Sequence, residues 1–294
     1  MTSVLADARR GHRGLLAFAV AMSVLTPVLA VLAVVDDRVL LGAPLWLKPL
    51  KFAISLALYS ATLSWMLGQL RERALPRVGW IIAVAGSIEM VIIVGQAAVG
   101  NRSHYNIDTP LSAALWSTMG ATIAVLWLAT LAVALRFLKV PGRDRVAGTA
   151  IRMGLVVALI GLGEGFLMAS MGAHAVGVPD GGPGLPLVGW STTGGDLRIA
   201  HFVGMHALQG LPLLAFALAA TRLDENTRVR LVRIAAAAWT GLVVLLTWQA
   251  LRAQPLLAPD AVTLAALATL VAVTGAATVG TLAAARRTTV PTTA

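Results

Sequence analysis

Eight apolar stretches, each of 21 to 26 residues, follow one another along the chain and constrain its fold more than any other feature. They cover residues 14–35, 49–70, 78–99, 111–135, 149–174, 198–220, 231–251 and 261–285. A helix rises about 1.5 Å per residue, so each stretch is long enough to cross the roughly 30 Å of hydrocarbon in a bilayer. Leu, Ala and Val dominate, and the period-two alternation of a membrane strand is missing. We therefore predict an all-α integral membrane protein, a bundle of about eight transmembrane helices in which residues 1–294 form one polytopic domain.

Composition supports this class and excludes several others. Hydrophobic residues make up 58% of the chain and charged residues 12%, which is far from a soluble domain. Cysteine is absent, which excludes disulfides, a thiolate nucleophile and thiolate-bound zinc or iron–sulfur clusters. The net charge is +10, but the basic residues are scattered between apolar runs and form no stripe for nucleic acid. We expect the partners to be the lipid bilayer and a small-molecule or lipid ligand.

Basic residues alternate between successive connections. The N-terminal stretch, the connections 71–77, 136–152 and 222–233 and the C-terminal segment carry 17 Lys or Arg, against 6 in the other connections. By the positive-inside rule, both termini are cytoplasmic. The first apolar stretch is followed by Asp36 and Asp37 and is long enough to be a retained span instead of a cleaved signal. We expect a multi-pass protein of a bacterial-type plasma membrane.

Four of the five histidines lie at or near ends of apolar stretches that this topology puts on the extracytoplasmic side: His104, His174, His201 and His206. The long Gly- and Pro-rich outer loop, residues 177–197, joins the stretches that carry His174 and His201. Such a loop can bring backbone groups close to a ligand, or it can be a plain surface connection. The shared position of the histidines predicts a candidate site in the outer half of the bundle.

Imidazoles from different helices suit haem or a transition metal as cofactor. His201 and His206 are five residues apart, which separates them by about 140° on a helix, so they cannot form the i, i+4 zinc clasp. A metal would need imidazoles from several helices, with Asp196 or a glutamate. Glycines at 161, 163, 165, 172, 204 and 210 would leave room for a flat macrocycle, or would simply allow close helix packing.

Glu89 and Glu164 lie in the middle of apolar stretches, each in a Gly-x-x-Glu pattern. A carboxyl group at this depth is costly, so each is either a catalytic acid or proton carrier, or the acceptor of a structural hydrogen bond. Further candidate ligand-binding residues accompany these groups. They are Gln96 on the Glu89 face, Gln209 on the His206 face, Asp196, and the two outer lysines Lys48 and Lys51. The lysines are either interfacial anchors or receptors for an anionic ligand.

Three functions follow from these residues. The first is a membrane-embedded oxidoreductase or metal-binding protein whose haem or metal is held by His104, His174, His201 and His206. The second is a proton-coupled transporter of a small solute that uses Glu89 and Glu164. The third is a metal-free intramembrane enzyme acting on a lipid or isoprenoid.

Overall fold

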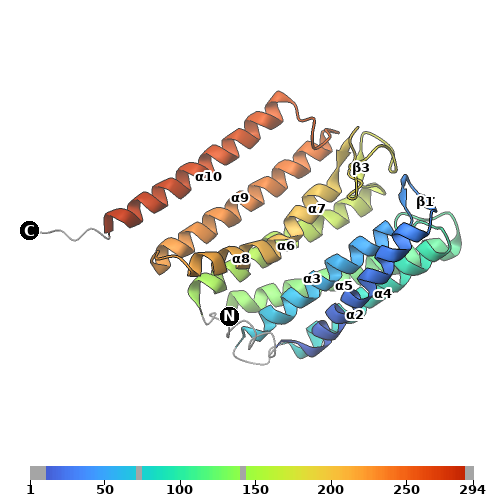
Figure 1. Cartoon of the computed structure of the whole chain (residues 1–294), viewed down its shortest axis with the longest axis horizontal. Coiled ribbons are helices and arrows are strands. Elements are labelled where there is room, and N and C mark those ends of the chain that lie inside the picture. The colour runs from blue at the N-terminus through green and yellow to red at the C-terminus, as the bar shows by residue number, and fades with distance from the viewer. Residues whose placement is uncertain (1–10, 71–74, 140–143, 289–294) are drawn as a thin grey trace, which may run out of the picture.

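The chain is all-α in the computed structural model, which describes residues 11–70, 75–139 and 144–288 (Figure 1). Seven helices in this part are long and apolar enough to cross a membrane. Five arginines counted above, at 9, 10, 71, 73 and 143, lie outside the described residues. The long helices are α2 (Arg13–Val35), α3 (Leu47–Gly68), α4 (Pro76–Ala98), α5 (Pro110–Lys139), α6 (Arg145–Met171), α9 (Glu225–Leu251) and α10 (Ala261–Thr288).

The sixth predicted span is not one continuous helix. It consists of α7 (Leu197–Met205) and α8 (Ala207–Ala219), which meet at His206 with a bend of 41°. The indole nitrogen of Trp239 in α9 donates to the Val203 carbonyl at 2.7 Å. In an unbroken helix, the Val203 carbonyl would accept a hydrogen bond from the Ala207 amide. A side chain that donates to this carbonyl instead interrupts the hydrogen-bond pattern of the helix. The break therefore coincides with a hydrogen bond from a residue of another helix.

Capping residues lie at the first or last turn of several helices. The Asp144 carboxylate accepts from the Ala147 amide at the start of α6, and Asp224 does the same for Thr227 at the start of α9. Gly172 closes α6 with a φ of 67°, a left-handed conformation that glycine adopts without strain. These caps satisfy backbone groups where a helix leaves the apolar region.

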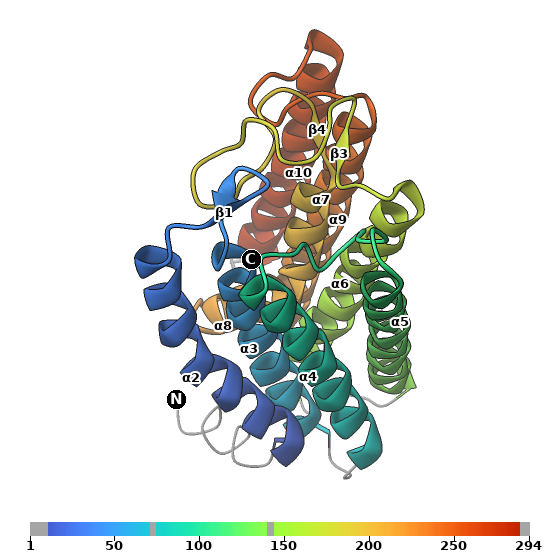
Figure 2. The same cartoon turned by 90° about the vertical axis from the view of Figure 1, so that its right-hand side faces the viewer.

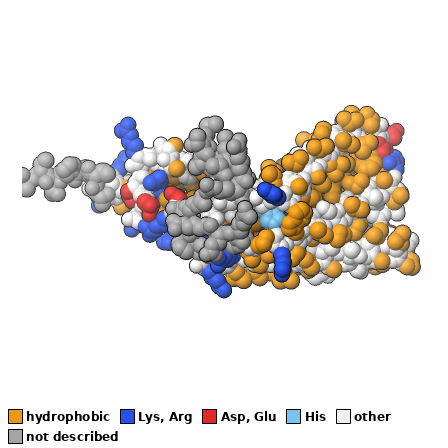
Figure 3. Space-filling view, turned by 90° about the horizontal axis from the view of Figure 1, so that it is seen from below, with side chains coloured by type: hydrophobic (Ala, Val, Ile, Leu, Met, Phe, Trp, Pro, Cys, Tyr) orange, Lys and Arg blue, Asp and Glu red, His pale blue; other side chains and the backbone are white. Residues whose placement is uncertain are grey.

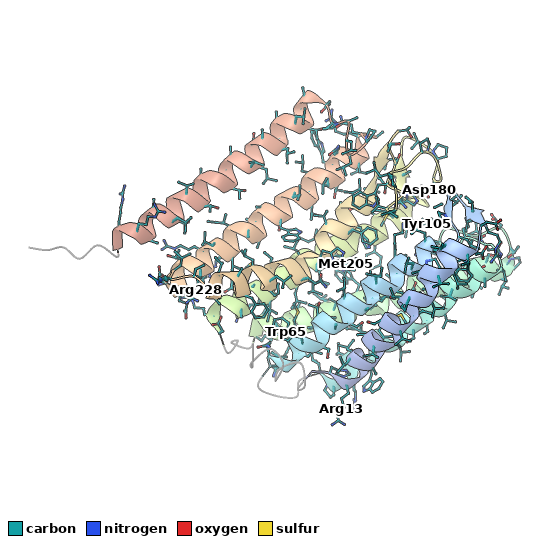
Figure 4. All side chains as sticks on the ribbon, viewed as in Figure 1. Arg13, Trp65, Tyr105, Asp180, Met205 and Arg228 are labelled. Carbon is teal, nitrogen blue, oxygen red and sulfur yellow. The ribbon has the colours of Figure 1, made fainter. Side chains whose placement is uncertain are left out.

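Two small antiparallel strand pairs, which the sequence did not predict, lie at one end of the bundle. The first pairs β1 (Val39–Leu40) with β2 (Ala43–Pro44), with Val39 opposite Pro44. The second pairs β3 (Ala175–Val176) with β4 (Gly195–Asp196), with Ala175 opposite Asp196. We call this end, with connections 36–46, 99–109, 172–196 and 252–260, the site end. The opposite end, which carries Arg13 and Arg228 in Figure 4, is the basic end.

The helices form two groups, α2–α5 and α6–α10, that lie side by side (Figures 1 and 2). Towards the basic end, the groups are joined by an apolar core to which α3, α5, α6 and α8 contribute. Its fully or nearly fully buried members include Leu63, Phe137, Ile151 and Leu208. The two groups are therefore tightly packed against each other in this half of the bundle.

The outside of the bundle is mostly apolar. In Figure 3, hydrophobic side chains cover most of the right-hand part of the face, and charged side chains gather at its margins. Valines on α2 such as Val24, Val28 and Val31 are more than half exposed. Burial of such a surface requires an apolar solvent, which agrees with the predicted membrane class.

The helix glycines separate into two kinds. A Cβ at Gly161 of α6 would lie 2.5 Å from the Met205 nitrogen and 2.6 Å from the Gly204 Cα, so α6 and α7 touch backbone to backbone. A Cβ at Gly210 would collide with the Trp239 ring. By contrast, a Cβ at Gly163 would meet nothing within 4 Å, and one at Gly165 would meet only the His201 ring at 3.9 Å. Gly161 and Gly204 serve packing, whereas Gly163 and Gly165 do not.

This difference predicts opposite effects of one substitution at two neighbouring positions. Gly161→Ala forces α6 and α7 apart and should cost about 1–3 kcal/mol, as overpacking does. Gly163→Ala adds a methyl group in open space and should be neutral or slightly stabilising, since alanine favours the helix. Thermal unfolding of the purified variants in detergent measures both, and equal melting temperatures would contradict the assigned backbone contact.

Candidate functional site

A cavity of about 560 Å³ lies between the two helix groups in the half of the bundle towards the site end. Its wall is made by α3, α4, α5, α6 and α7 and by the connections above them. Three lining residues are labelled in Figure 4: Tyr105 and Asp180 lie at the site end, and Met205 lies deeper in the bundle. The bundle is thus hollow at one end and solid at the other.

The loop 177–197 covers this cavity as a roof, to which both helix groups contribute. The Lys51 ammonium donates to the Val188 carbonyl at 3.0 Å, and the Arg198 guanidinium donates to the neighbouring Gly189 carbonyl at 2.5 Å. The loop also reaches the hairpin of β1 and β2, where a Cβ at Gly181 would lie 3.1 Å from the Leu41 Cβ (Figure 2). Two cations and one hairpin therefore hold the roof over the cavity.

Asp196 organises this roof without lining the cavity. Its carboxylate accepts from the Ser191 amide at 2.9 Å and from the Arg198 guanidinium at 2.9 and 2.6 Å. It also caps α7 by accepting from the Arg198 amide. All these bonds are local to the loop and the helix start, so the geometry gives this predicted ligand-binding residue a positioning role.

His201 offers a free ring nitrogen in the cavity wall. Its Nδ1 lies 2.7 Å from the Gly161 carbonyl oxygen. Because a carbonyl oxygen can only accept, Nδ1 carries the hydrogen, and Nε2 keeps its lone pair for another partner. The same glycine that lets α7 approach α6 thus holds the imidazole in one orientation.

His104 lines the same cavity from the connection between α4 and α5. Its ring lies edge-on to Phe52 and is tilted against Trp116, with centroid distances of 5.5 and 5.4 Å. Its Nδ1 lies 3.1 Å from the Ser103 hydroxyl oxygen. Burial, with the nearby Lys48 charge, lowers the pKa of His104 well below its usual value. This imidazole is neutral at physiological pH.

His174 also lines the cavity and lies between two carboxylates. Its Nδ1 is 3.4 Å from Asp180 and 3.7 Å from Asp196, and it has no hydrogen-bond partner. Burial and the Arg198 charge lower the pKa of His174 to about 4, although both carboxylates act in the opposite direction. Asp180 itself accepts from the Ala175 amide at 2.9 Å, which ties the roof to β3.

Four other candidates do not line the cavity: His206, Gln209, Gln96 and Glu164. His206 lies at the helix break, with Nδ1 3.3 Å from the Gln209 amide oxygen. Gln209 in turn donates to Thr62 of α3 at 3.2 Å, which links the two helix groups. Within the described ranges, no three His, Asp or Glu side chains are grouped closely enough to hold a metal ion.

The two glutamates within the long apolar helices, Glu89 of α4 and Glu164 of α6, have matching surroundings. Glu89 accepts from the Thr122 hydroxyl at 2.6 Å, and Glu164 accepts from the Thr247 hydroxyl at 2.7 Å. In each, the second carboxyl oxygen is buried without a partner. The expected structural hydrogen bond is present in both, but it satisfies only half of the group. Glu89 differs because it lines the cavity, at its inner part, with 1% of its surface exposed.

The two outer lysines have separate roles. Both line the cavity, three residues apart on the first turns of α3. Lys51 is engaged with the roof, as described above, whereas the Lys48 ammonium has no hydrogen-bond or ion-pair partner among the described residues. An interfacial anchor would point to headgroups, but Lys48 faces a cavity between the helix groups.

The structure adds two residues that the sequence reasoning did not select, Arg198 and Trp116. Arg198 follows Asp196 by two residues at a helix start, and this spacing could have indicated a paired guanidinium. Trp116 contacts both His104 and Tyr105, and nothing in its surroundings in the sequence distinguishes it from the other tryptophans.

No family model, curated protein or solved structure matches this chain. The function is therefore argued from the geometry of the cavity.

The partly buried imidazole of His174 predicts a pH dependence of stability. In the unfolded chain this group protonates near pH 6.5, but in the folded protein only near pH 4. Between these values the unfolded chain binds more protons, so the free energy of unfolding should fall as the pH drops from about 6.5 to about 4. His174→Gln should flatten this fall. Melting temperatures of the wild-type protein and of His174→Gln, measured from about pH 6.5 to about pH 4, test this prediction. Parallel curves for the two proteins would contradict it.

Proposed function

We propose that the protein is a membrane-embedded haem-binding protein of the oxidoreductase class, with the cavity on the extracytoplasmic side. The positive-inside rule supports this orientation, since arginines are concentrated towards the basic end. The observation that carries the proposal is His201, whose Nδ1 is anchored on the Gly161 carbonyl while Nε2 remains available in the cavity wall. Haem-ligating histidines need this combination of a fixed ring and a free nitrogen.

The residues around His201 fit a flat, largely apolar group. A Cβ at Gly120 of α5 would meet nothing within 4 Å, and one at Gly165 of α6 would meet only His201. Both glycines line the cavity and leave space at its wall. The cavity volume of about 560 Å³ falls within the range of small-molecule and cofactor sites. Haem bound there would supply one-electron chemistry.

Haem is favoured over a metal ion held only by protein side chains. A zinc or iron site needs three or more protein ligands, and the described His, Asp and Glu side chains form no such group. A haem iron takes four ligands from the porphyrin and only one or two from the protein. His201 supplies one, and His104, the neutral imidazole in the same cavity, is the candidate for the second.

Absorption spectroscopy tests this function directly. The protein, purified after expression with added haem, should show a Soret band that is largely lost in His201→Ala. His206→Ala is the matched control and should keep the band, because His206 faces Gln209 and lies outside the cavity wall. The proposal fails if the wild-type protein binds no haem, or if both variants bind it equally.

A second candidate, a proton-coupled carrier, is favoured by the contrast between the two halves of the bundle. The cavity lies between two helix groups, and the apolar core that includes Leu63 and Leu208 separates it from the basic end. Transporters that alternate between two open states bind substrate at such an interface. Glu89, which lines the cavity with one unpartnered carboxyl oxygen, would be the proton-binding group.

The carrier predicts a solute flux that depends on Glu89. In proteoliposomes with an imposed pH gradient, uptake of the solute should fall at least about tenfold in Glu89→Gln, which keeps the shape but cannot exchange the proton. Glu164→Gln is the control, because Glu164 has the same type of hydrogen bond but does not line the cavity. Equal flux in the wild-type protein and Glu89→Gln would exclude this candidate.

A further inference from the structure

Lys48 is a cation without a counter-ion inside a ligand-sized cavity. Its ammonium has no hydrogen-bond or ion-pair partner in the part of the chain that the structure describes, although it is only partly exposed. The two nearby cations differ, since Lys51 donates to the Val188 carbonyl and Arg198 is paired with Asp196. An unpaired charge that is partly removed from water is costly, so this arrangement needs an explanation.

The charges around Lys48 leave it unneutralised. Arg198 and Lys51 repel it, whereas Asp180 and Glu89 attract it without touching it. Asp180 accepts from the Ala175 amide and Glu89 accepts from the Thr122 hydroxyl. One oxygen of Glu89 has no partner, but neither carboxylate contacts the Lys48 ammonium. Among the described residues, no protein group therefore neutralises the Lys48 ammonium by direct contact.

A large part of the cavity wall is apolar or aromatic. Below the lysine, it is lined by Phe52, Ile93, Trp116, Met119, Phe166 and Met205. A small inorganic anion would leave this surface uncovered, whereas a molecule with a hydrocarbon or aromatic body would cover it.

We propose that Lys48 binds the carboxylate or phosphate oxygen of an amphipathic ligand whose apolar body occupies the cavity beneath it. The anionic group lies under the roof, next to the loop 177–197, and the body extends towards Met205. This inference deepens the proposed function, because it rests on the same cavity being a ligand site. It does not require a haem iron or a histidine ligand.

Native mass spectrometry of the full chain in a neutral maltoside detergent tests the inference. The probes are dodecanoate and dodecyl phosphate, with dodecanol as the uncharged analogue and inorganic phosphate as the free anion. We expect one dodecanoate or dodecyl phosphate to be retained per chain, and neither dodecanol nor inorganic phosphate. Lys48→Met should weaken retention roughly tenfold or more, as loss of a charge-assisted bond does, and Lys48→Arg should largely restore it.

Lys139→Met is the matched control, because it removes the same charge from an exposed position at the end of α5, away from the cavity. If Lys48→Met does not fold, Lys48→Gln replaces it, with the melting temperature as the criterion of folding. Retention that is unchanged in the folded Lys48 variant, or equal for dodecanol and dodecanoate, overturns the inference. Lys48-dependent retention of inorganic phosphate alone would overturn the amphipathic class of ligand.

The outcome is separable from that of the haem test. A protein without a Soret band that still retains dodecanoate through Lys48 would refute haem and support the anion receptor. A protein that binds haem equally well with and without Lys48, and that retains no dodecanoate, would support haem binding and refute the role of Lys48 as an anion receptor.

Discussion

The close approach of α6 and α7 at Gly161 and Gly204 is the contact on which the candidate site depends. Because neither residue has a side chain, the two backbones meet without a spacer, and the Gly161 carbonyl comes within 2.7 Å of the His201 ring. The contact fixes where α7 lies and how the imidazole is turned. Asp196 caps the start of the same short helix, and Arg198 in its first turn donates to the Gly189 carbonyl of the roof, so α7 connects the wall of the cavity to its cover.

One half of the bundle is tightly packed, and the other half contains the cavity. Apolar side chains fill the packed half, whereas polar and charged side chains gather around the cavity. Large aliphatic side chains fill the interface between α3, α5, α6 and α8 towards the basic end. Towards the site end, the interface contains cations, imidazoles and loop carbonyls that need ligands or solvent to satisfy them. Hydrogen bonds from both helix groups to carbonyls of the loop 177–197 tie the edges of this gap. Lys51 and Arg198 provide those ties.

Part of the candidate site was predictable from the sequence. Histidines near helix ends, a Gly-rich loop between two of them and two unexpected lysines pointed to the end of the bundle at which the cavity lies. The sequence could not show that His104, His174 and His201 share a wall while His206 does not. Helical spacing already places His201 and His206 about 140° apart. Which of the two faces the cavity depends on how α7 packs against α6 and α9, through the His201 contact with Gly161 and the Trp239 bond to Val203, 36 residues away. Likewise, the partners of Glu89 and Glu164 lie on other helices, and no spacing along one helix indicates them.

Sequence alone therefore predicted the all-α class and the approximate positions of the long apolar helices. The reason is that backbone groups in hydrocarbon must be hydrogen-bonded within their own segment, so the length of an apolar run reflects this requirement. The sequence did not predict that the sixth stretch is divided into α7 and α8. It also identified the costly residues, since an isolated carboxyl or ammonium among apolar neighbours stands out in any apolar run. Only the tertiary structure decided which of these groups meet. Contacts between residues far apart in the chain determine how the helices are rotated, where the bend at His206 lies and where the cavity forms. The sequence around any one of these residues does not indicate such contacts.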